Sequence, residues 1–344
     1  MAAAAGVTSI TVSRFLREPA VVARDTAARI EAALAHTGYV PNKLAGLLAS
    51  GAGNIVAALL PNLANLIFAE TAQGLSDGLQ AAGFELLIAS TGYSLEREEH
   101  QLRALLGWHP AAVVVTGRRH SAGAQKLLAN AAAAGTPVIE IWDHHPPGRG
   151  ARRTRFTQIG FNHDEVGRAM ADHLLGAGHR CLAYVDSGVA EDYRAHERGL
   201  AFATAVRAAG ARVTVLVAPA GDAFDAGRHV LGDLLRAGPP TITAAAFAND
   251  HLACGALLEA TRRKVSVPAG MALLGFGDFA IARQLSPALS SVQLPRHAIG
   301  SETATCLLDA LRHGKAAVPV SMPWTLVARG STSAGTSAGT SAGT

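Results

Sequence analysis

A short segment near the amino terminus has residue types and spacing suited to reading DNA. Gly6 marks a tight turn, after which a hydroxyl at Thr8 or Ser9 can cap a helix. The apolar side of this helix would consist of Val12, Phe15 and Leu16. Its other side offers Ser9, Ile10, Ser13 and Arg14. The second helix of a helix-turn-helix needs such a face, because small or polar residues can reach base edges in the major groove.

Other chemistries find little support in the sequence. The adjacent His144 and His145 invite a metal site, but they lie in a Pro/Gly/Arg loop without an HExxH pattern or cysteine partners. No Walker loop, GxSxG elbow or GxGxxG turn after a strand is present. We therefore expect no metal, no cofactor and no enzymatic activity.

The composition limits the class of protein further. A chain of 344 residues with 49% hydrophobic residues predicts about two domains with buried cores. The formal net charge of +4 excludes a broadly basic polymer binder but permits a small basic module. Three widely spaced cysteines give no disulfide framework, the first residues are not a signal peptide, and no apolar run could span a membrane. These features predict a cytoplasmic protein with no membrane partner.

Two series of strands and helices follow from residue 54. The strands are apolar throughout and each is followed by a helix, which predicts parallel sheets covered on both faces. The second series begins at a strand over Thr157–Phe161, and a late strand over Val320–Val327 is expected to cross back between the lobes. Two doubly wound lobes place a ligand cleft at the carboxyl ends of their strands.

Three stretches of the chain, AGVTSITVSRFL, HTGYVPNKLAGLLASG and IVAALLPNLANLIFAE, carry a resemblance to a known family. Together they resemble the lactose/galactose repressor family of bacterial transcription regulators, from residue 1 to about 329. The triplet Glu197–Gly199 and the segments Ala248–Asp250 and Leu274–Asp278 support the resemblance. Segments such as VTSITVSRFLREP and QLSPALSSVQLPRHAIG most resemble the branch that represses gluconate operons.

The resemblance implies an α/β protein with a helix-turn-helix head and a two-lobed sensor like a periplasmic binding protein, built from two doubly wound parallel sheets. We expect four regions: the head at 1–38, a hinge helix and linker at 39–53, the sensor at 54–330 and a disordered tail at 331–344. Lobe one would hold about 54–155 and 293–322, and lobe two about 156–292 and 323–330. The tail repeats SAGT three times and has little to bury. Because only five residues precede Gly6, whereas the family's first helix begins earlier, we expect that helix to be incomplete.

The resemblance also implies roles in DNA binding. Ser9, Ile10 and Arg14 would contact bases, and Thr8, Thr11 and Ser13 are candidates for phosphate contacts. Residues 42–50 match the hinge helix, beginning at Asn42, and Leu48 falls where the family inserts a leucine into the minor groove. Such a protein acts as a homodimer on a pseudo-palindromic operator in double-stranded DNA.

A sugar or sugar-acid effector, gluconate above all, needs hydrogen-bond donors, a cation and an aromatic wall. Residues at the predicted strand ends supply them: Asn65, Phe68, Tyr93, Arg118 and Asp143 in lobe one, and Phe161, Arg198, Asn249, Asp250 and Asp278 in lobe two. By the resemblance, Arg198 and Asp250 are the sugar-binding arginine and aspartate. Arg118 or Arg119 would be an additional clamp on a carboxylate.

Less specific interpretations remain open from the sequence. Asn249 and Asp250 could simply cap a helix, and Arg198 could form a surface ion pair. The chain could also be a two-lobed sugar-binding protein without DNA-binding activity, its truncated head being non-functional. A transport protein of the same plan would need an export signal, and a carbohydrate enzyme would need a catalytic constellation.

Overall fold

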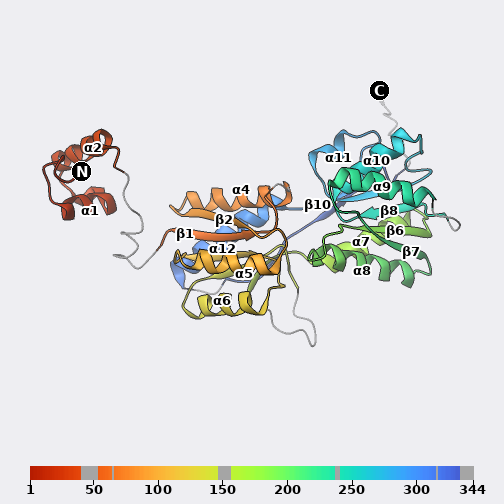
Figure 1. Ribbon diagram of the computed structural model, residues 1–344, viewed down its shortest axis with the longest axis horizontal. Coiled ribbons are helices and arrows are strands. Elements are labelled where there is room, and N and C mark those ends of the chain that lie inside the picture. Colours follow the sequence, from red (N-terminus) through yellow and green to blue (C-terminus); the bar gives the residue numbers. More distant parts are fainter. Residues whose placement is uncertain (40–52, 64–65, 146–155, 237–240, 315–316, 334–344) are drawn as a thin grey trace, which may run out of the picture. The chain divides into compact units, whose positions relative to one another are not determined.

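The structure is a computed structural model that describes residues 1–39, 53–63, 66–145, 156–236, 241–314 and 317–333. The chain divides into two compact units, Met1–Gly53 and Asn54–Thr344. We describe each unit by itself, and call the first the head and the second the sensor (Figure 1). Among the described helices, none is both long and apolar enough to cross a membrane.

The head contains two α-helices joined through a short 3-10 turn: α1 (Ser9–Arg17), η1 (Pro19–Val21) and α2 (Arg24–Thr37). Thr8 caps α1, because its hydroxyl accepts the N–H of Thr11 at 3.2 Å. Gly38, in the left-handed conformation with φ 58°, ends α2. Before Gly6, the described chain makes a single turn, in which Ala5 N–H donates to Met1 O at 3.0 Å.

The core of the head is small. Ala5, Phe15, Ile30 and Ala33 are buried together, and Val12 is also buried on α1. The prediction that Leu16 belongs to the buried side is wrong, since this side chain is 37% exposed. Leu16 is one residue past Phe15, and a step of about 100° around the helix turns it away from α2.

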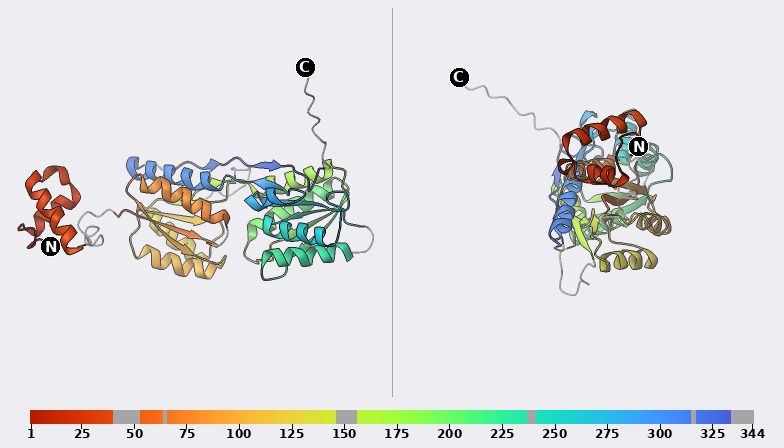
Figure 2. Two further views of the ribbon diagram at one scale, coloured as in Figure 1. Left: turned by 90° about the horizontal axis from the view of Figure 1, so that it is seen from above. Right: turned by 90° about the vertical axis from the view of Figure 1, so that its left-hand side faces the viewer.

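The first sheet of the sensor has the strand order β11-β5-β4-β3-β1-β2 and all its pairs are parallel. Its strands are β1 (Ile55–Leu60), β2 (Glu85–Ser90), β3 (Ala112–Thr116), β4 (Val138–Ile141), β5 (Thr157–Gly160) and β11 (Val320–Ser321). The helices that cover it are α4 (Leu66–Gln80), α5 (Leu95–Leu106), α6 (Ala122–Ala133) and α12 (Arg296–His313). Pairs α4/α12 and α5/α6 lie on opposite faces (Figures 1 and 2).

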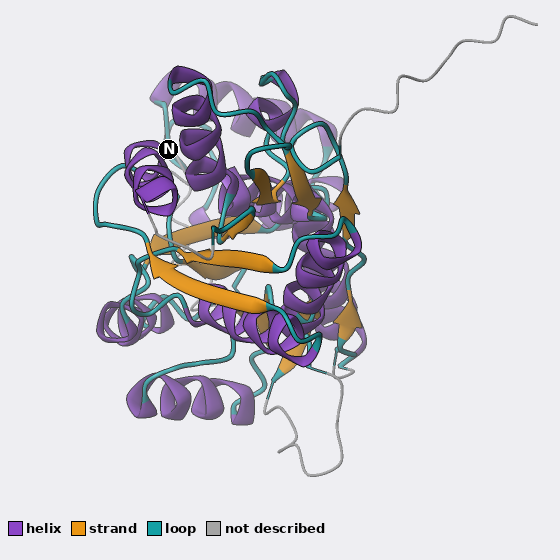
Figure 3. Ribbon diagram, turned by 90° about the vertical axis from the view of Figure 1, so that its right-hand side faces the viewer, coloured by secondary structure: helices purple, strands orange, loops and turns teal. Residues whose placement is uncertain are grey.

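The second sheet has the order β12-β10-β9-β8-β6-β7. Its strands are β6 (Cys181–Asp186), β7 (Arg212–Val217), β8 (Ala244–Phe247), β9 (Ala272–Gly277), β10 (Ser290–Gln293) and β12 (Thr325–Val327). The helices of this lobe are α7 (His163–Gly176), α8 (Tyr193–Ala208), α9 (Ala223–Arg236), α10 (Asp250–Arg262) and α11 (Ala280–Gln284). Figure 3 shows the strands of the sensor between layers of helices. The predicted fold class, α/β with two doubly wound and mainly parallel sheets, is confirmed.

Two predicted boundaries and one predicted strand differ from the structure, although the chain passes between the two sheets after residue 321, as expected. The strand at Thr157 does not open lobe two, because β5 pairs with β4 in the first sheet. The predicted strand over Val320–Val327 is two strands, β11 beside β5 and β12 antiparallel to β10, in different sheets. Pro323 lies between them and has no N–H to continue a ladder.

The other wrong boundary concerns the tail. Ser331 and Thr332 are buried, although disorder was predicted from residue 331. Leu273 N–H donates to Ser331 O at 2.9 Å, and the Ser331 hydroxyl donates to Leu273 O at 2.6 Å. The sequence did not indicate these contacts, because they are hydrogen bonds of a hydroxyl and the backbone. A sequence pattern reveals apolar contacts, which this segment lacks. The rest of the predicted tail, 334–344, lies outside the described residues.

Candidate effector cavity and DNA-reading helix

A cavity with about 430 Å³ of empty space lies at the carboxyl ends of strands from both sheets. Its lining includes Phe68, Tyr93, Trp142, His163, Asp192, Arg194, Arg198, Asn249 and Phe276. The location is the one that doubly wound sheets favour, since the loops after their strands meet there.

Aromatic side chains form one wall of the cavity. The Phe68 ring meets Tyr93 and Trp142 edge-on, with centroids 6.4 and 5.7 Å apart. Trp142 is 2% exposed, and its indole Nε1 has no hydrogen-bond partner among the described residues. An apolar wall with an unused donor suits the C–H face and a hydroxyl of a sugar-like ligand.

The Arg198 side chain lies beside this aromatic wall, and contacts with Phe276, Ala248 and His163 fix its position. Its guanidinium carbon lies 3.7 Å from the Phe276 ring centroid, and Nη2 donates to Ala248 O at 2.9 Å. Nη1 lies 3.0 Å from His163 Nδ1, while His163 Nε2 lies 2.9 Å from Trp142 O. Burial lowers the pKa of His163 well below its ordinary value, with Arg198 contributing. The neutral ring therefore accepts a hydrogen bond from Arg198 at Nδ1 and donates one from Nε2 to Trp142 O. Arg198 Nε is a buried donor without a described partner.

Arg194 supplies a second buried guanidinium. The residue is 6% exposed and lines the cavity, yet no carboxylate among the described residues forms a hydrogen bond with it. Burial by itself would lower the pKa of Arg194, but the nearby Tyr193, Asp192 and Asp143 raise it. The side chain therefore stays positively charged in a site that water reaches poorly.

The structure brings together four of the ten predicted effector residues, Phe68, Tyr93, Arg198 and Asn249. Asn249 also caps α10, because its Oδ1 accepts the N–H of Leu252 at 3.0 Å, so the two interpretations of this residue are compatible. Asn65 lies outside the described residues.

The five other predicted residues do not line the cavity. Asp250 is fully buried: its Oδ1 accepts from the Ser291 hydroxyl at 2.6 Å and its Oδ2 from Phe279 N–H at 2.8 Å. Burial raises the pKa of Asp250 to about 6, and these hydrogen bonds oppose that change. Asp278 pairs with Arg329 at 2.7 Å, and Phe161 packs between Trp142 and Phe276. These side chains shape the strand ends, which explains why their positions looked functional.

Arg118 and Asp143 make contacts between the lobes. Arg118 Nη2 donates to both carboxylate oxygens of Glu197, at 2.7 and 2.8 Å. Asp143 accepts a hydrogen bond from the Tyr193 hydroxyl. In this structure Arg118 is thus engaged with a protein carboxylate, and the clamp on an effector carboxylate stays a prediction.

The sequence interpretation missed Trp142, His163, Asp192 and Phe276, and did not select Arg194. Trp142 directly follows β4, so its position at a strand end was a usable signal. Phe276 directly follows the strand that the sequence predicts and carried the same usable signal, whereas His163 begins a predicted helix and looked like ordinary core. Their involvement depends on how the two lobes meet, which no local pattern reveals.

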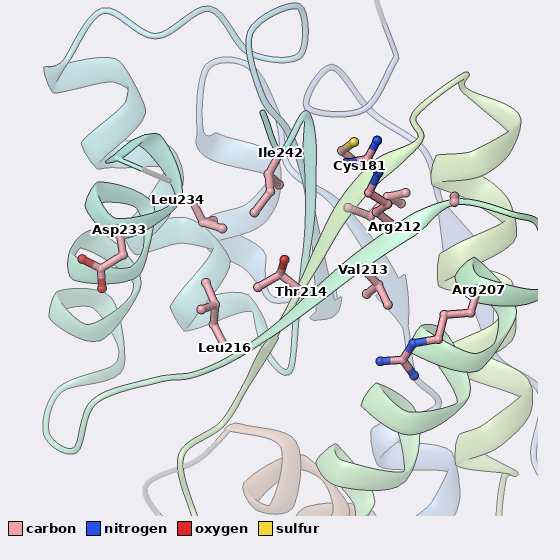
Figure 4. Close-up of a pocket in the computed structure, with 11 residues that line it drawn as sticks. Cys181, Arg207, Arg212, Val213, Thr214, Leu216, Asp233, Leu234 and Ile242 are labelled. Carbon is pink, nitrogen blue, oxygen red and sulfur yellow. The ribbon is translucent and has the colours of Figure 1, made fainter. Parts of the chain in front are cut away.

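A larger hollow opens in lobe two beside the edge strand β7 (Figure 4). Leu216, Leu234 and Ile242 line it, with Arg207 and Asp233 among its polar residues. It lies along a sheet edge, includes the first residues of β6 and β7, and does not gather buried donors as the effector cavity does. We therefore place the effector in the smaller cavity.

In the head, α1 presents the predicted contact residues to solvent. Ser9, Ile10, Ser13 and Arg14 are exposed, with Ile10 at 71%, while Thr8 is exposed as the N-cap and Thr11 is half-buried. An apolar side chain so exposed has no packing role and suits contact with a thymine methyl group. Asn42 and Leu48 lie outside the described residues.

Comparisons with known proteins match this architecture. Residues 1–42 match the bacterial regulatory proteins of the lacI family, and residues 171–332 match the periplasmic binding protein-like domain. The transcriptional regulator GntR of Pseudomonas aeruginosa is 38% identical over 332 residues, which cover 95% of this chain and 93% of that protein. The chain belongs to the lacI family of regulatory proteins.

Solved structures of lacI-family members show the same fold. A regulator from Silicibacter pomeroyi superimposes with a TM-score of 0.86 at 30% identity, covering 96% of this chain and 97% of that one. The lac repressor dimer bound to operator and the anti-inducer ONPF gives 0.81 at 20% identity, covering 96% and 97%. As a lacI-family member the chain is a DNA-binding transcription regulator, and its named relatives are regulators, not enzymes.

Proposed function

We propose that this regulator is a sequence-specific repressor whose operator affinity is controlled by a sugar acid, with gluconate as the effector. The observation that carries the proposal is the buried guanidinium of Arg194, which faces the cavity without a hydrogen-bonded carboxylate. A buried charge of this kind is costly unless a partner of opposite charge binds it. The carboxylate of a sugar acid is such a partner, and Arg can bind it through two hydrogen bonds.

The other cavity groups suit the hydroxylated part of the same ligand. Trp142 Nε1 and Arg198 Nε are donors without described partners, and Asp192 can accept from hydroxyl groups. The aromatic wall of Phe68, Tyr93 and Trp142 can pack against carbon-bound hydrogens. A neutral sugar would leave Arg194 without a hydrogen-bonded carboxylate among the described residues, which favours an acid.

On the DNA side, Ser9, Ile10 and Arg14 are proposed to contact bases, and Thr8, Thr11 and Ser13 to contact phosphates. A homodimer on a pseudo-palindromic operator, acting in the cytoplasm, fits the family and the lac repressor dimer seen on its operator. The hinge roles of Asn42 and Leu48 stay predictions.

Calorimetric titration of the full chain with gluconate and with glucose tests the effector class. We expect gluconate to bind at least tenfold more tightly, because a charge-assisted hydrogen bond contributes about 1.5–3 kcal/mol. Equal binding of glucose would overturn the sugar-acid assignment and leave the regulator assignment untouched. A gel shift with the operator from the gene's own upstream region tests the DNA side, and no shift would exclude repression.

A further inference from the structure

Four residues beside the effector cavity, but outside its lining, join the two lobes. Arg118 and Asp143 follow β3 and β4 of the first sheet, and Tyr193 and Glu197 lie on α8 of the second lobe. We call these four residues the interlobe latch. Tyr193 is 9% exposed and Asp143 is fully buried, so these contacts are largely removed from solvent.

The contacts within the interlobe latch are mainly charge-assisted hydrogen bonds. The guanidinium of Arg118 binds both carboxylate oxygens of Glu197 at 2.7 and 2.8 Å, and Arg119 adds a third contact with Glu197 at 2.7 Å. The Tyr193 hydroxyl donates to Asp143 and accepts the Arg118 backbone N–H at 2.7 Å. Charge-assisted contacts with low exposure are stronger than surface ion pairs.

Glycine at 117 permits this approach of the lobes. A Cβ at Gly117 would lie 2.5 Å from both the Tyr193 hydroxyl and Arg194 Nη1, and the residue has φ +87°. Only glycine tolerates both conditions without strain. The loop after β3 is thus built to receive the first turn of α8.

The spacing along α8 connects the latch to the cavity. Tyr193 and Glu197 are four residues apart and face lobe one, while Arg194 and Arg198 are four apart and face the cavity. Fixing the first pair against lobe one therefore also fixes the direction of the second pair. The latch residues act on the cavity through their neighbours in the helix.

We propose that the interlobe latch holds the lobes together and thereby sets the affinity for the effector, without any of its four side chains touching the effector. The effect on affinity rests on the proposed function, whereas the hold between the lobes does not. Arg118, Tyr193, Glu197 and Asp143 are accordingly positioning residues.

A double-mutant cycle on the full chain tests the effect on affinity. Calorimetric titration with gluconate compares wild type, Arg118→Gln, Glu197→Gln and the double variant, with Glu191→Gln, an exposed glutamate next to α8, as the control. We expect each single variant to bind gluconate about tenfold more weakly and the loss in the double variant to be smaller than the sum of the two single losses, because both changes break the Arg118–Glu197 contact. If Arg118 instead clamps the effector directly, Glu197→Gln would keep or raise the affinity, and that result would overturn the proposal.

A second measurement does not depend on the effector. In a chain carrying Trp108→Phe and Trp324→Phe, Trp142 is the sole tryptophan and reports on the cavity wall. We expect Tyr193→Phe and Glu197→Gln to increase quenching of Trp142 by acrylamide at least twofold, and Glu191→Gln to leave it unchanged. If the quenching of Trp142 is unchanged in both latch variants, the proposal that the latch holds the lobes together is wrong. If wild type does not bind gluconate, the proposed effector is wrong and this quenching result alone decides the latch.

Discussion

At the scale of single residues, the positive charge of Arg194 distinguishes this cavity from a site for a neutral sugar. Replacing it with Gln removes the charge that we assign to the effector carboxylate. We expect Arg194→Gln to weaken gluconate binding about 10- to 100-fold, corresponding to about 1.5–3 kcal/mol for a charged hydrogen bond, with a smaller loss for Arg194→Lys. Calorimetric titration measures the loss, with Arg207→Gln on the exposed face of the same helix as the control. An affinity within twofold of wild type would show that Arg194 does not bind the effector.

His120 is a second residue with a measurable signature. Burial would lower its pKa, but the contacts of its ring with Glu140 and Glu98 prevail and raise the pKa to about 9. Nδ1 lies 2.7 Å from Glu98, whereas Nε2 lies 3.5 Å from Glu140, so we regard Glu98 as the hydrogen-bonded partner. Because the folded-state pKa exceeds the ordinary 6.5, the stabilisation is complete below about pH 6.5 and is lost as pH rises through about 9.

The His120 effect can be isolated by comparison. The free energy of unfolding of the wild type relative to His120→Gln should fall by on the order of 3 kcal/mol between pH 6.5 and 9. Denaturant titrations at several pH values measure it, and the exposed His313→Gln serves as the control. A difference between wild type and His120→Gln that does not change with pH would mean that His120 is not held protonated.

At the scale of elements, α1 is the part whose role the sequence predicts most directly. Arg14→Ala should weaken operator binding about 10- to 100-fold, since a bidentate Arg–guanine contact is worth ~1–3 kcal/mol. Binding to unrelated DNA should change much less, because base contacts specify and phosphate contacts do not. Gel shifts on both DNAs provide the comparison, with Arg207→Ala as a matched change outside the head. An equal loss on both DNAs would assign Arg14 to phosphate contact instead.

The C-terminal segment is an element that the sequence did not predict. A chain ending after Gly330 loses the contacts of Ser331 with Leu273 and of Thr332 with His173 and Ser290. We expect this truncation to lower the free energy of unfolding by about 2–4 kcal/mol, from several buried hydrogen bonds at ~1 kcal/mol each. Ending the chain after Ser333 keeps these contacts and should have no effect. Thermal unfolding curves compare the two, and equal midpoints would contradict the assigned role.

Elements with a strong periodic pattern were predictable, and the contacts between them were not. The alternation of apolar strands and helices after residue 54 was predictable, because apolar spacing is a local property. The lobe that receives β5 and the division between β11 and β12 depend on pairing partners far along the chain. Phe68 could be selected as a cavity residue from its position after a strand, and Arg198 from the family resemblance. Neither source could distinguish Asp250 from a lining residue.

At the scale of the whole molecule, the central claim is a coupling between two sites. If the effector and the operator favour different states of the protein, each must weaken the binding of the other by the same factor. The latch provides a physical reason for the sensor to have discrete states, since its contacts between lobes are either made or broken. The coupling is therefore measured as a ratio of affinities, and the presence of either site alone does not establish it.

The most direct test is the operator affinity of the full chain, measured by fluorescence anisotropy without gluconate and with gluconate at a concentration that calorimetry shows to be saturating. We expect an operator dissociation constant about 10- to 100-fold higher with gluconate, a coupling free energy of about 1–3 kcal/mol. An operator affinity that is the same with and without saturating gluconate would contradict it.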